Sequence, residues 1–274
     1  MGEKGKNIVI VGSSFIGMEV GNALAKENNV TIIGMEKAPL ERVMGEQVGK
    51  IFQKKLESSG VKFHMNAGVA KATPSSSDSK KVGAVHLKDD TELPADLVIL
   101  GVGVAPATEF LKSSKEVTLE KDGSIKTDAA FAVESVKDVY AIGDIATYPY
   151  YGPGGNGAPV RIEHWNVAQN AGRSVGSTIA GKGKAKDFIP VFWSALGSQL
   201  RYSGNTMAQG WDGLVLKGQP DEGKFVAYYA KGETVVAVAT MNFDPVNSKC
   251  VDLMLRGLMP TKSELENGKD PLTI

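Results

Sequence analysis

Three small residues at fixed spacing, Gly12, Ser14 and Gly17, form the part of the sequence best suited to bind a phosphate group. They occupy the glycine positions of the G-x-G-x-x-G pattern. In that pattern the first glycine permits a tight strand-to-helix turn, the second lets the backbone approach a pyrophosphate, and the third packs the helix against the strand. Serine in the middle weakens the pattern without abolishing it, because serine is small and its hydroxyl can donate to a phosphate. The alternative is a tight turn that binds nothing.

A carboxylate that could bind a ribose is expected about 20 residues after the last glycine of such a turn. Glu36 follows Gly17 by 19 residues, and Gly34 occupies the usual place at the strand end. Glu36 is therefore the ribose candidate, whereas the neighbouring Lys37 could instead favour a 2′-phosphate, so the choice between NADH and NADPH stays open. Glu19 is a further candidate, expected in the first helical turn, where the helix dipole stabilises a carboxylate whatever its function.

These residues need a strand before the turn and a helix after it, and the amino-terminal part of the sequence contains both. Short branched-aliphatic runs at 7–12, 29–34 and 61–65 are separated by helical segments, which predicts a βαβαβ unit. The run at 96–103 is almost continuously apolar, as in a parallel strand buried on both faces. The polar stretch at 73–81 predicts the tip of a hairpin.

The pattern changes after Pro106. A short helix at 107–114 and strand signals at 116–127 and 137–146 precede a helix from about Trp165 to Ala180. The charged stretch at 181–187 predicts a domain boundary. Beyond it, short strands dominate, followed by a helix at about 245–257.

Charge and hydropathy exclude several classes of protein. Lysine plus arginine and aspartate plus glutamate are balanced at 31 each, so no net field draws the chain to nucleic acid or an anionic membrane. The apolar stretch at 97–105 is about half of the roughly 20 residues that a membrane-spanning helix needs. The first apolar run ends in a glycine turn without a cleavage site, which predicts a strand rather than a secretory signal. We therefore expect a cytoplasmic or mitochondrial protein.

The cysteine and histidine content limits the redox and metal chemistry. The single cysteine, Cys250, excludes an intrachain disulfide and a Cys-x-x-Cys redox pair. The three histidines, His64, His86 and His164, with one thiol cannot complete a standard structural zinc site from His and Cys alone. We therefore predict no metal site.

Three further stretches carry a family resemblance: VILGVGVAPAT at 98–108, DVYAIGDIA at 138–146 and RIEHWNVAQNAG at 161–172. They resemble the FAD-dependent pyridine nucleotide oxidoreductases of the apoptosis-inducing-factor and ferredoxin/rubredoxin-reductase type. Three other stretches are similar to the apoptosis-inducing factor 3 subgroup: GMEKAPLERVMGEQVG, LRYSG and VAVATMNFDPVNSK. The likeness covers nearly the whole chain, and the ordered series is far more specific than any one motif.

The resemblance implies roles for individual residues. It implies that the glycine turn and Glu19 cradle NAD(P)H, and that Gly103 closes over the nicotinamide half. It implies that Asp144 binds the ribityl or pyrophosphate region of FAD. The residues beside the isoalloxazine ring would be Glu163, His164 and Trp165, with Trp193 touching the flavin from a third domain. The turn consists of Gly12, Ser13, Ser14, Phe15, Ile16 and Gly17.

The flavin-site residues also have purely structural interpretations. Asp144 could cap the following turn. His164 and Trp165 could be an ordinary core pair, and Trp193 could be an aromatic residue in the core of a strand.

The resemblance implies an NAD(P)H oxidoreductase in which the protein orients the cofactors that carry the chemistry. Electrons would pass from NAD(P)H through FAD to a one-electron acceptor such as an iron–sulfur protein or a quinone. The absence of a Cys-x-x-Cys pair excludes disulfide reduction. The alternative is a truncated, non-catalytic module that binds a nicotinamide nucleotide or a partner protein.

The sequence also departs from the family pattern. The family has two glycine fingerprints, one for FAD and one for NAD(P)H, and only one is present. GNGAPV at 155–160 has the wrong context, because Pro159 follows at once and no strand precedes it. We therefore expect a chain that lacks the first FAD-binding half and binds NAD(P)H better than FAD. One cysteine also cannot supply the Rieske module that the similar subgroup carries.

The predicted fold is α/β with three parts: a Rossmann-like NAD(P)-binding domain at 1–105, a partial FAD-binding domain at 106–183, and an α+β domain with an antiparallel sheet at 184–274. The partial domain should expose apolar surface or an open strand edge, which could lead to a homo-oligomer.

Overall fold

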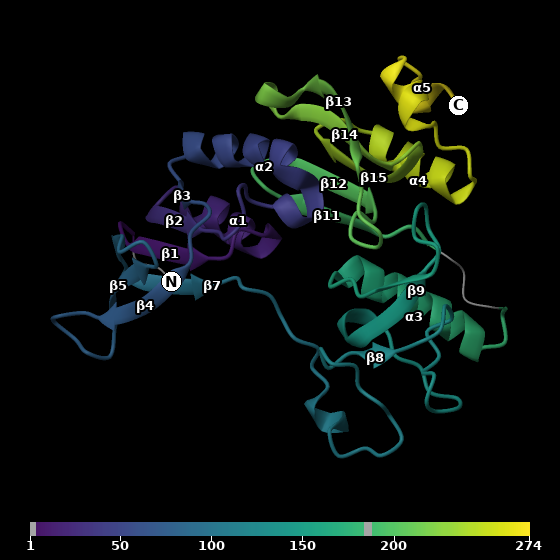
Figure 1. Ribbon diagram of the computed structural model, residues 1–274, viewed down its shortest axis with the longest axis horizontal. Helices are drawn as coiled ribbons and strands as arrows, with labels where there is room; N and C mark the ends of the chain where they lie inside the picture. Colours follow the sequence, from purple (N-terminus) through teal and green to yellow (C-terminus); the bar gives the residue numbers. More distant parts are fainter. Residues whose placement is uncertain (1–3, 184–187) are drawn as a thin grey trace. The chain divides into compact units, whose positions relative to one another are not determined.

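The fold is taken from a computed structural model of the chain, which describes residues 4–183 and 188–274 (Figure 1). The chain divides into two compact units. The first comprises Met1–Gly103, Ser194–Gln199 and Pro220–Gly223, and the second comprises Val104–Trp193, Leu200–Gln219 and Lys224–Ile274. The division into three domains stays a prediction, and residues 184–187 of its second boundary lie outside the described residues.

Up to Gly103, the described part of the first unit holds two helices and seven strands. They are β1 (Asn7–Val11), α1 (Phe15–Leu24), β2 (Asn29–Ile33), α2 (Glu41–Ser58), β3 (Lys62–His64), β4 (Val69–Pro74), β5 (Val82–Leu87), β6 (Glu92–Pro94) and β7 (Leu97–Leu100). Strands β3-β2-β1-β7 form a parallel sheet in that order. From β1 the chain first adds β2 and β3 on one side and later adds β7 on the other, so the strand order reverses between β1 and β7. Parallel sheets of this kind bind ligands beyond the carboxyl ends of the two strands at such a point. The predicted βαβαβ unit and the hairpin at 73–81 are confirmed.

Successive side chains of a strand point to opposite faces of the sheet, and this alternation explains the layers of the first unit. Ile10 and Ile32 point toward α1, where a side chain at Gly21 would contact both. Val9 and Ile33 point to the opposite face and pack with Val85 and other residues of the β4-β5-β6 sheet. Both faces of the parallel sheet are thereby covered (Figure 1), which accounts for its continuous apolar strands.

The second unit holds most of the remaining elements. They are η1 (Glu109–Leu111), β8 (Ile125–Lys126), η2 (Gly143–Ile145), β9 (Ala146–Tyr150), β10 (Ala158–Val160), α3 (Trp165–Ile179), β11 (Val191–Ala195), β12 (Gln199–Gly204), β13 (Gly213–Gln219), η3 (Pro220–Glu222), β14 (Lys224–Lys231), β15 (Thr234–Met241), α4 (Val246–Leu255), α5 (Lys262–Glu266) and η4 (Pro271–Thr273). Residues Ser194–Gln199, which include the end of β11 and the start of β12, belong to the first unit. The same holds for η3.

A five-stranded sheet with the order β11-β12-β15-β14-β13 dominates the second unit. Its β12–β15, β15–β14 and β14–β13 pairs are antiparallel, so the predicted fold class is confirmed. One face packs against α4 and α5 (Figure 1), through a core that includes Val238, Val246, Cys250 and Leu265. A capping box between Thr261 and Glu264 begins α5.

The region between Pro106 and β9 differs from the prediction. The helix expected at 107–114 is reduced to η1, and of the two strands expected at 116–127 and 137–146 only β8 forms, with isolated bridges elsewhere. A strand needs a neighbour to satisfy its backbone, and these segments have few. Large apolar side chains are exposed here, as expected. They include Phe110, Val139 and Ile142, and Tyr151 after β9 and Ile179 at the end of α3 are exposed as well.

The helix predicted at Trp165–Ala180 is confirmed as α3. It packs against β9 and β10 through Ala171, Val175 and Tyr148. Among the described residues, no helix combines the length and the apolar character needed to cross a bilayer.

Candidate functional site

The glycine turn of the first unit requires glycine at two positions for different reasons. Gly12 has φ +115°, and a Cβ there would lie 2.2 Å from the carbonyl oxygen of Gly101, which follows β7. A Cβ on Gly17 would lie 2.0 Å from the carbonyl oxygen of Gly12. The N–H of Gly12 donates to the carbonyl of Ile33 at 2.8 Å. The turn is therefore closely packed against the carboxyl ends of β1, β2 and β7.

Ser14, the departure from the glycine pattern, has an ordinary backbone conformation. It is the N-cap of α1 with φ −86° and ψ −174°, an extended geometry that any residue adopts. Its carbonyl accepts the N–H of Met18 at 2.9 Å, and its exposed side chain makes no capping hydrogen bond. The substitution thus leaves the turn intact, and the hydroxyl stands at the amino terminus of a helix, where unpaired N–H groups favour an anion. Beside it, Phe15 is half-buried and Ile16 is exposed.

The structure brings Glu36 next to the turn, as its spacing predicts. The buried Ser13 hydroxyl lies 3.4 Å from Oε2 of Glu36. The carbonyl of Ser13 accepts the N–H of Leu40 at 2.9 Å. Lys37 is exposed, and its backbone N–H donates to the Glu41 carboxylate at 2.7 Å. The Glu36 carboxylate therefore lies beside the turn, and Lys37 directly follows it in the chain.

The placement of Glu19 in the first turn of the helix is wrong. Because Ser14 is the N-cap, α1 begins at Phe15 and Glu19 lies in its second turn. Its carboxylate accepts a hydrogen bond from the hydroxyl of Ser194, which is buried. Sequence reasoning missed Ser194, because nothing local links residues so far apart in the chain. Gly103 follows β7 at an exposed position with φ +103°.

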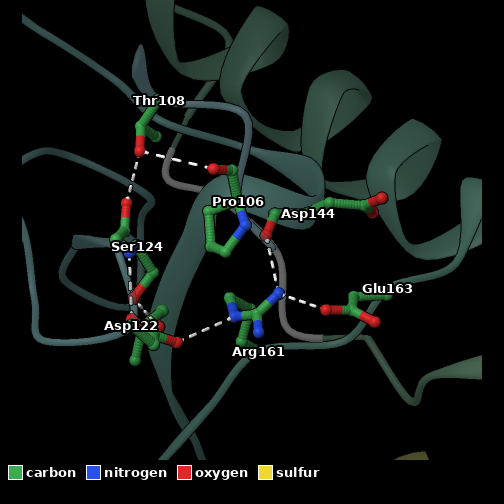
Figure 2. Close-up of polar contacts among 9 residues, drawn as sticks. Pro106, Thr108, Asp122, Ser124, Asp144, Arg161 and Glu163 are labelled. Carbon is green, nitrogen blue, oxygen red and sulfur yellow. Dashed lines mark hydrogen bonds and ion pairs between the residues drawn. The ribbon is translucent and has the colours of Figure 1, made fainter. Parts of the chain in front are cut away.

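In the second unit, Arg161 holds the segments that carry two of the predicted flavin-binding residues (Figure 2). It lies between β10 and α3. Its Nη1 donates to the backbone carbonyl of Asp144 at 3.2 Å and to the Glu163 carboxylate, and its Nε donates to Asp122 at 3.2 Å. Sequence reasoning missed Arg161, although it stands two residues before Glu163.

The loop that contains Asp122 is itself tied to its neighbours. Oδ1 of Asp122 accepts the N–H of Ser124 at 2.9 Å, and Ser124 shares a hydrogen bond with Thr147 at 2.8 Å. The hydroxyl of Thr108 donates to the carbonyl of Gly123 at 2.7 Å. Hydrogen bonds from Ser124, and then from Arg161, lower the pKa of Asp122. The carboxylate therefore stays ionised as a partner for the guanidinium.

His164, Trp165 and Trp193 meet in one aromatic cluster, which also includes Phe192 and Tyr202. The rings of Trp165 and Trp193 are edge to face with centroids 4.7 Å apart, and the His164 ring lies 5.9 Å and 6.1 Å from them. Phe192 lies 5.3 Å from His164 and stacks on Tyr202 at 4.8 Å. Nδ1 of His164 also accepts the N–H of Asn166 at 3.2 Å, which caps α3.

Exposure argues against the structural interpretations of three of these residues. Trp165 is 51% exposed and Trp193 is 50% exposed, so neither is a core aromatic. Asp144 is exposed, and it lies within η2, whose N-cap is Ile142, rather than at a capping position. Among residues 4–183 and 188–274, no group of three histidine, cysteine or acidic side chains could hold a metal ion.

Comparisons with known proteins agree with the geometry of both units. The profile of the pyridine nucleotide-disulphide oxidoreductase family matches residues 1–172. Apoptosis-inducing factor 3 of Homo sapiens is 35% identical over 265 residues, which are 96% of this chain and 42% of that protein. Putidaredoxin reductase of Pseudomonas putida is 30% identical over 86% of this chain and 54% of that protein. The chain therefore spans about half the length of these relatives.

Solved structures of similar proteins share the fold. In the covalent putidaredoxin reductase–putidaredoxin complex, the matching chain superimposes with a TM-score of 0.85 and 26% identity, over 95% of this chain and 60% of that one. A ferredoxin reductase of Rhodopseudomonas palustris gives 0.84 at 24% identity, over 94% of this chain and 62% of that one. The resemblance predicted from the motifs is confirmed.

Proposed function

Because the chain belongs to the pyridine nucleotide-disulphide oxidoreductase family, we propose that it binds NAD(P)H at the glycine turn of its first unit and contributes to flavin-dependent electron transfer. The observation that carries this proposal is the turn itself. Gly12 and Gly17 leave no room for side chains, and the amino terminus of α1 begins directly after them. Such a turn at a point where the strand order reverses suits a diphosphate.

The nucleotide half of the proposal assigns a role to each side chain near the turn. The pyrophosphate would lie against the backbone of Ser13 and Ser14, with the exposed Ser14 hydroxyl as a further donor. Glu36 would accept hydrogen bonds from the ribose hydroxyls, because an ionised carboxylate is only an acceptor. The exposed Lys37 would add attraction for a 2′-phosphate, so both nicotinamide nucleotides are candidate ligands. Gly103 would lie over the nicotinamide half.

The residues of the second unit fit one part of a flavin. Asp144 offers an exposed carboxylate, an acceptor that suits the hydroxyls of a ribityl chain and would repel a pyrophosphate. Trp165 and Trp193 offer half-exposed aromatic rings of the kind that contact a planar heterocycle. Glu163 and His164 would lie at the edge of that heterocycle. FAD, when bound, accepts electrons from NAD(P)H and passes them on singly.

The proposed acceptor is a small iron–sulfur protein. Support comes from the relative whose solved structure is a complex with putidaredoxin. A dithiol route is not available to this chain, because Cys250 is its only cysteine and is buried.

Titration of the purified protein with NADH, NADPH and FAD tests the proposal. We expect NADH or NADPH to bind, and to bind more tightly than FAD. Gly17→Ala should abolish nicotinamide-nucleotide binding. Gly176→Ala is the matched control, because a Cβ at Gly176 meets no atom within 4 Å, and it should leave binding unchanged. No binding of either nicotinamide nucleotide to the folded wild-type protein would overturn the proposal.

A second candidate is a nucleotide- or partner-binding module without catalysis. It is supported by the single glycine fingerprint among these residues, which on its own suits a nicotinamide nucleotide. Steady-state NADH oxidation with ferricyanide, measured with and without added FAD, separates the two functions. Oxidation that depends on FAD supports the oxidoreductase, whereas NADH binding without oxidation supports the module.

A further inference from the structure

Arg161 joins three segments of the second unit through one guanidinium group. It contacts the turn at Asp122, the backbone of Asp144 in η2, and Glu163 just before α3. Its side chain is only 19% exposed. The planar, fixed donor geometry of a guanidinium allows it to hold several acceptors at defined angles.

The contact with Asp144 is made through the backbone and not through the side chain. Figure 2 shows the guanidinium next to the Asp144 carbonyl, with the Asp144 carboxylate directed away from it. Among the residues that the structure describes, none donates a hydrogen bond to that carboxylate. Arg161 therefore fixes the loop and leaves the acceptor oxygens available for a ligand.

The charge balance argues against a direct role of Arg161 in binding an anion. Asp122 and Glu163 both contact the guanidinium, so two carboxylates surround one positive charge. A phosphate would have to displace one of these contacts, and it would meet negative charge on either side. Arg161 is better suited to hold other groups than to bind a cofactor itself.

We propose that Arg161 is a positioning residue, which holds η2 and the Glu163 segment so that Asp144 presents its carboxylate to the ribityl hydroxyls of a flavin. This inference rests on the proposed function. Lysine cannot replace arginine fully, because an ammonium lacks the planar fork that reaches the Asp144 carbonyl and Asp122 from different nitrogen atoms.

A double-mutant cycle in the full chain tests the inference, with FAD and riboflavin as probes. Riboflavin has the ribityl chain and the isoalloxazine ring without phosphates, so it reports on Asp144 without any contribution from the pyrophosphate or the adenosine. Arg161→Met and Asp144→Ala should each weaken the binding of both flavins by about tenfold. The double variant should be little worse than either single variant, because interactions that act through one group are not additive. Arg161→Lys should recover part of the loss.

Two further measurements separate positioning from general unfolding. NADH affinity should stay close to wild type in every variant, and each variant should keep one cooperative melting transition well above the assay temperature. In the protein without flavin, the amides of Gly143–Ala146 should exchange faster in Arg161→Met. Arg256→Met is the matched control, since Arg256 makes an exposed ion pair with Asp252 on α4, and it should change none of these values.

Each outcome has one meaning. If the folded wild-type protein binds neither FAD nor riboflavin, the flavin part of the proposed function fails and this inference fails with it. If wild type binds flavin and Arg161→Met binds equally well, only this inference is overturned. Additive losses in the double variant would also overturn it, because Arg161 would then act independently of Asp144.

Discussion

The indole rings of Trp165 and Trp193 meet edge to face, with centroids 4.7 Å apart and planes at 89°. Trp165 begins α3 and Trp193 lies in β11, so tertiary packing alone joins them. Both rings remain about half exposed. A perpendicular pair of this kind is a common aromatic geometry, but a pair that exists only to fill a core would be buried. The exposure is what makes this cluster a candidate contact for the planar ligand proposed above.

The third tryptophan allows a direct test of that connection. In Trp211→Phe, the remaining indole emission comes from Trp165 and Trp193, and we expect added riboflavin or FAD to quench it. In Trp165→Leu/Trp193→Leu, emission comes from Trp211, which packs on Tyr229, and quenching should be lost. Each single Trp→Leu change should weaken flavin binding by about 0.5–1.5 kcal/mol, the usual contribution of an aromatic contact. Equal quenching in both variants would contradict the prediction.

Replacing Ser14 tests whether the missing glycine matters. With φ −86° this position does not need glycine, so Ser14→Gly should bind NAD(P)H no more tightly than Ser14→Ala, because both variants lose the hydroxyl. Ser14→Ala removes the hydroxyl that we propose donates to a charged phosphate, and it should weaken binding by about 1.5–3 kcal/mol. Calorimetric titration measures both. A tenfold gain in Ser14→Gly would show that the hydroxymethyl group obstructs the ligand.

The pair Glu36 and Lys37 should set the preference between NADH and NADPH. Glu36→Gln removes the charged acceptor for the ribose hydroxyls and relieves repulsion of a 2′-phosphate, so the ratio of NADPH to NADH affinity should rise by about tenfold, equivalent to 1.4 kcal/mol. Lys37→Met should lower that ratio. The exposed change Lys80→Met, in the turn between β4 and β5, serves as the control, and an unchanged ratio in both test variants would contradict the assignment.

The hydrogen bond between Ser194 and Glu19 should contribute to stability. Ser194→Ala leaves the Glu19 carboxylate without that donor, and the free energy of unfolding should fall by about 1–3 kcal/mol. Urea denaturation measures this loss. The double change Glu19→Gln/Ser194→Ala should be less destabilising than the sum of the two single changes, because the partners share one contact. Full additivity would mean that the contact carries no energy.

Cys250 should be chemically inert in the native protein. It is fully buried, and burial raises the pKa of its thiol from 9.0 to about 12. Only the thiolate reacts, so a disulfide-exchange reagent at neutral pH should modify Cys250 only at urea concentrations that unfold the chain. Rapid modification of the native protein would contradict this.

The same shift predicts a pH dependence of stability. The unfolded thiol ionises near pH 9 while the native thiol stays protonated to about pH 12. The contribution of Cys250 is therefore fully present below pH 9 and falls by about 1.4 kcal/mol per pH unit as the pH rises toward 12. The difference in unfolding free energy between wild type and Cys250→Ala isolates this contribution. A difference that stays constant from pH 8 to pH 11 would contradict the shift.

Local pattern was sufficient for the first unit. The periodicity of the strands, the glycine spacing and the position of Glu36 depend on neighbouring residues and on the regular rise of a strand or helix, so they could be predicted without knowing the fold. The cysteine count alone likewise excluded a Cys-x-x-Cys pair within these 274 residues. Glu19 was wrongly placed in the first helical turn, because the residue at which α1 begins depends on how the glycine turn packs against Gly101.

Contacts between distant segments could not be predicted in this way. Whether the residues at 116–127 and 137–146 form strands depends on which neighbours can accept their backbone hydrogen bonds, and pattern alone does not say. The partners of Arg161 could not be predicted either, because Asp122 lies in a loop whose sequence has no periodic pattern.

By itself, the sequence determined the parallel α/β unit, its glycine turn and the nearby carboxylate, since each follows from residues close together along the chain. Only the tertiary structure decided that Ser194 would reach Glu19, that Trp193 would meet Trp165, and that Arg161 would bind the carbonyl of Asp144 rather than its carboxylate. Those pairings arise when separate segments pack, and their geometry depends on the whole unit rather than on any local pattern.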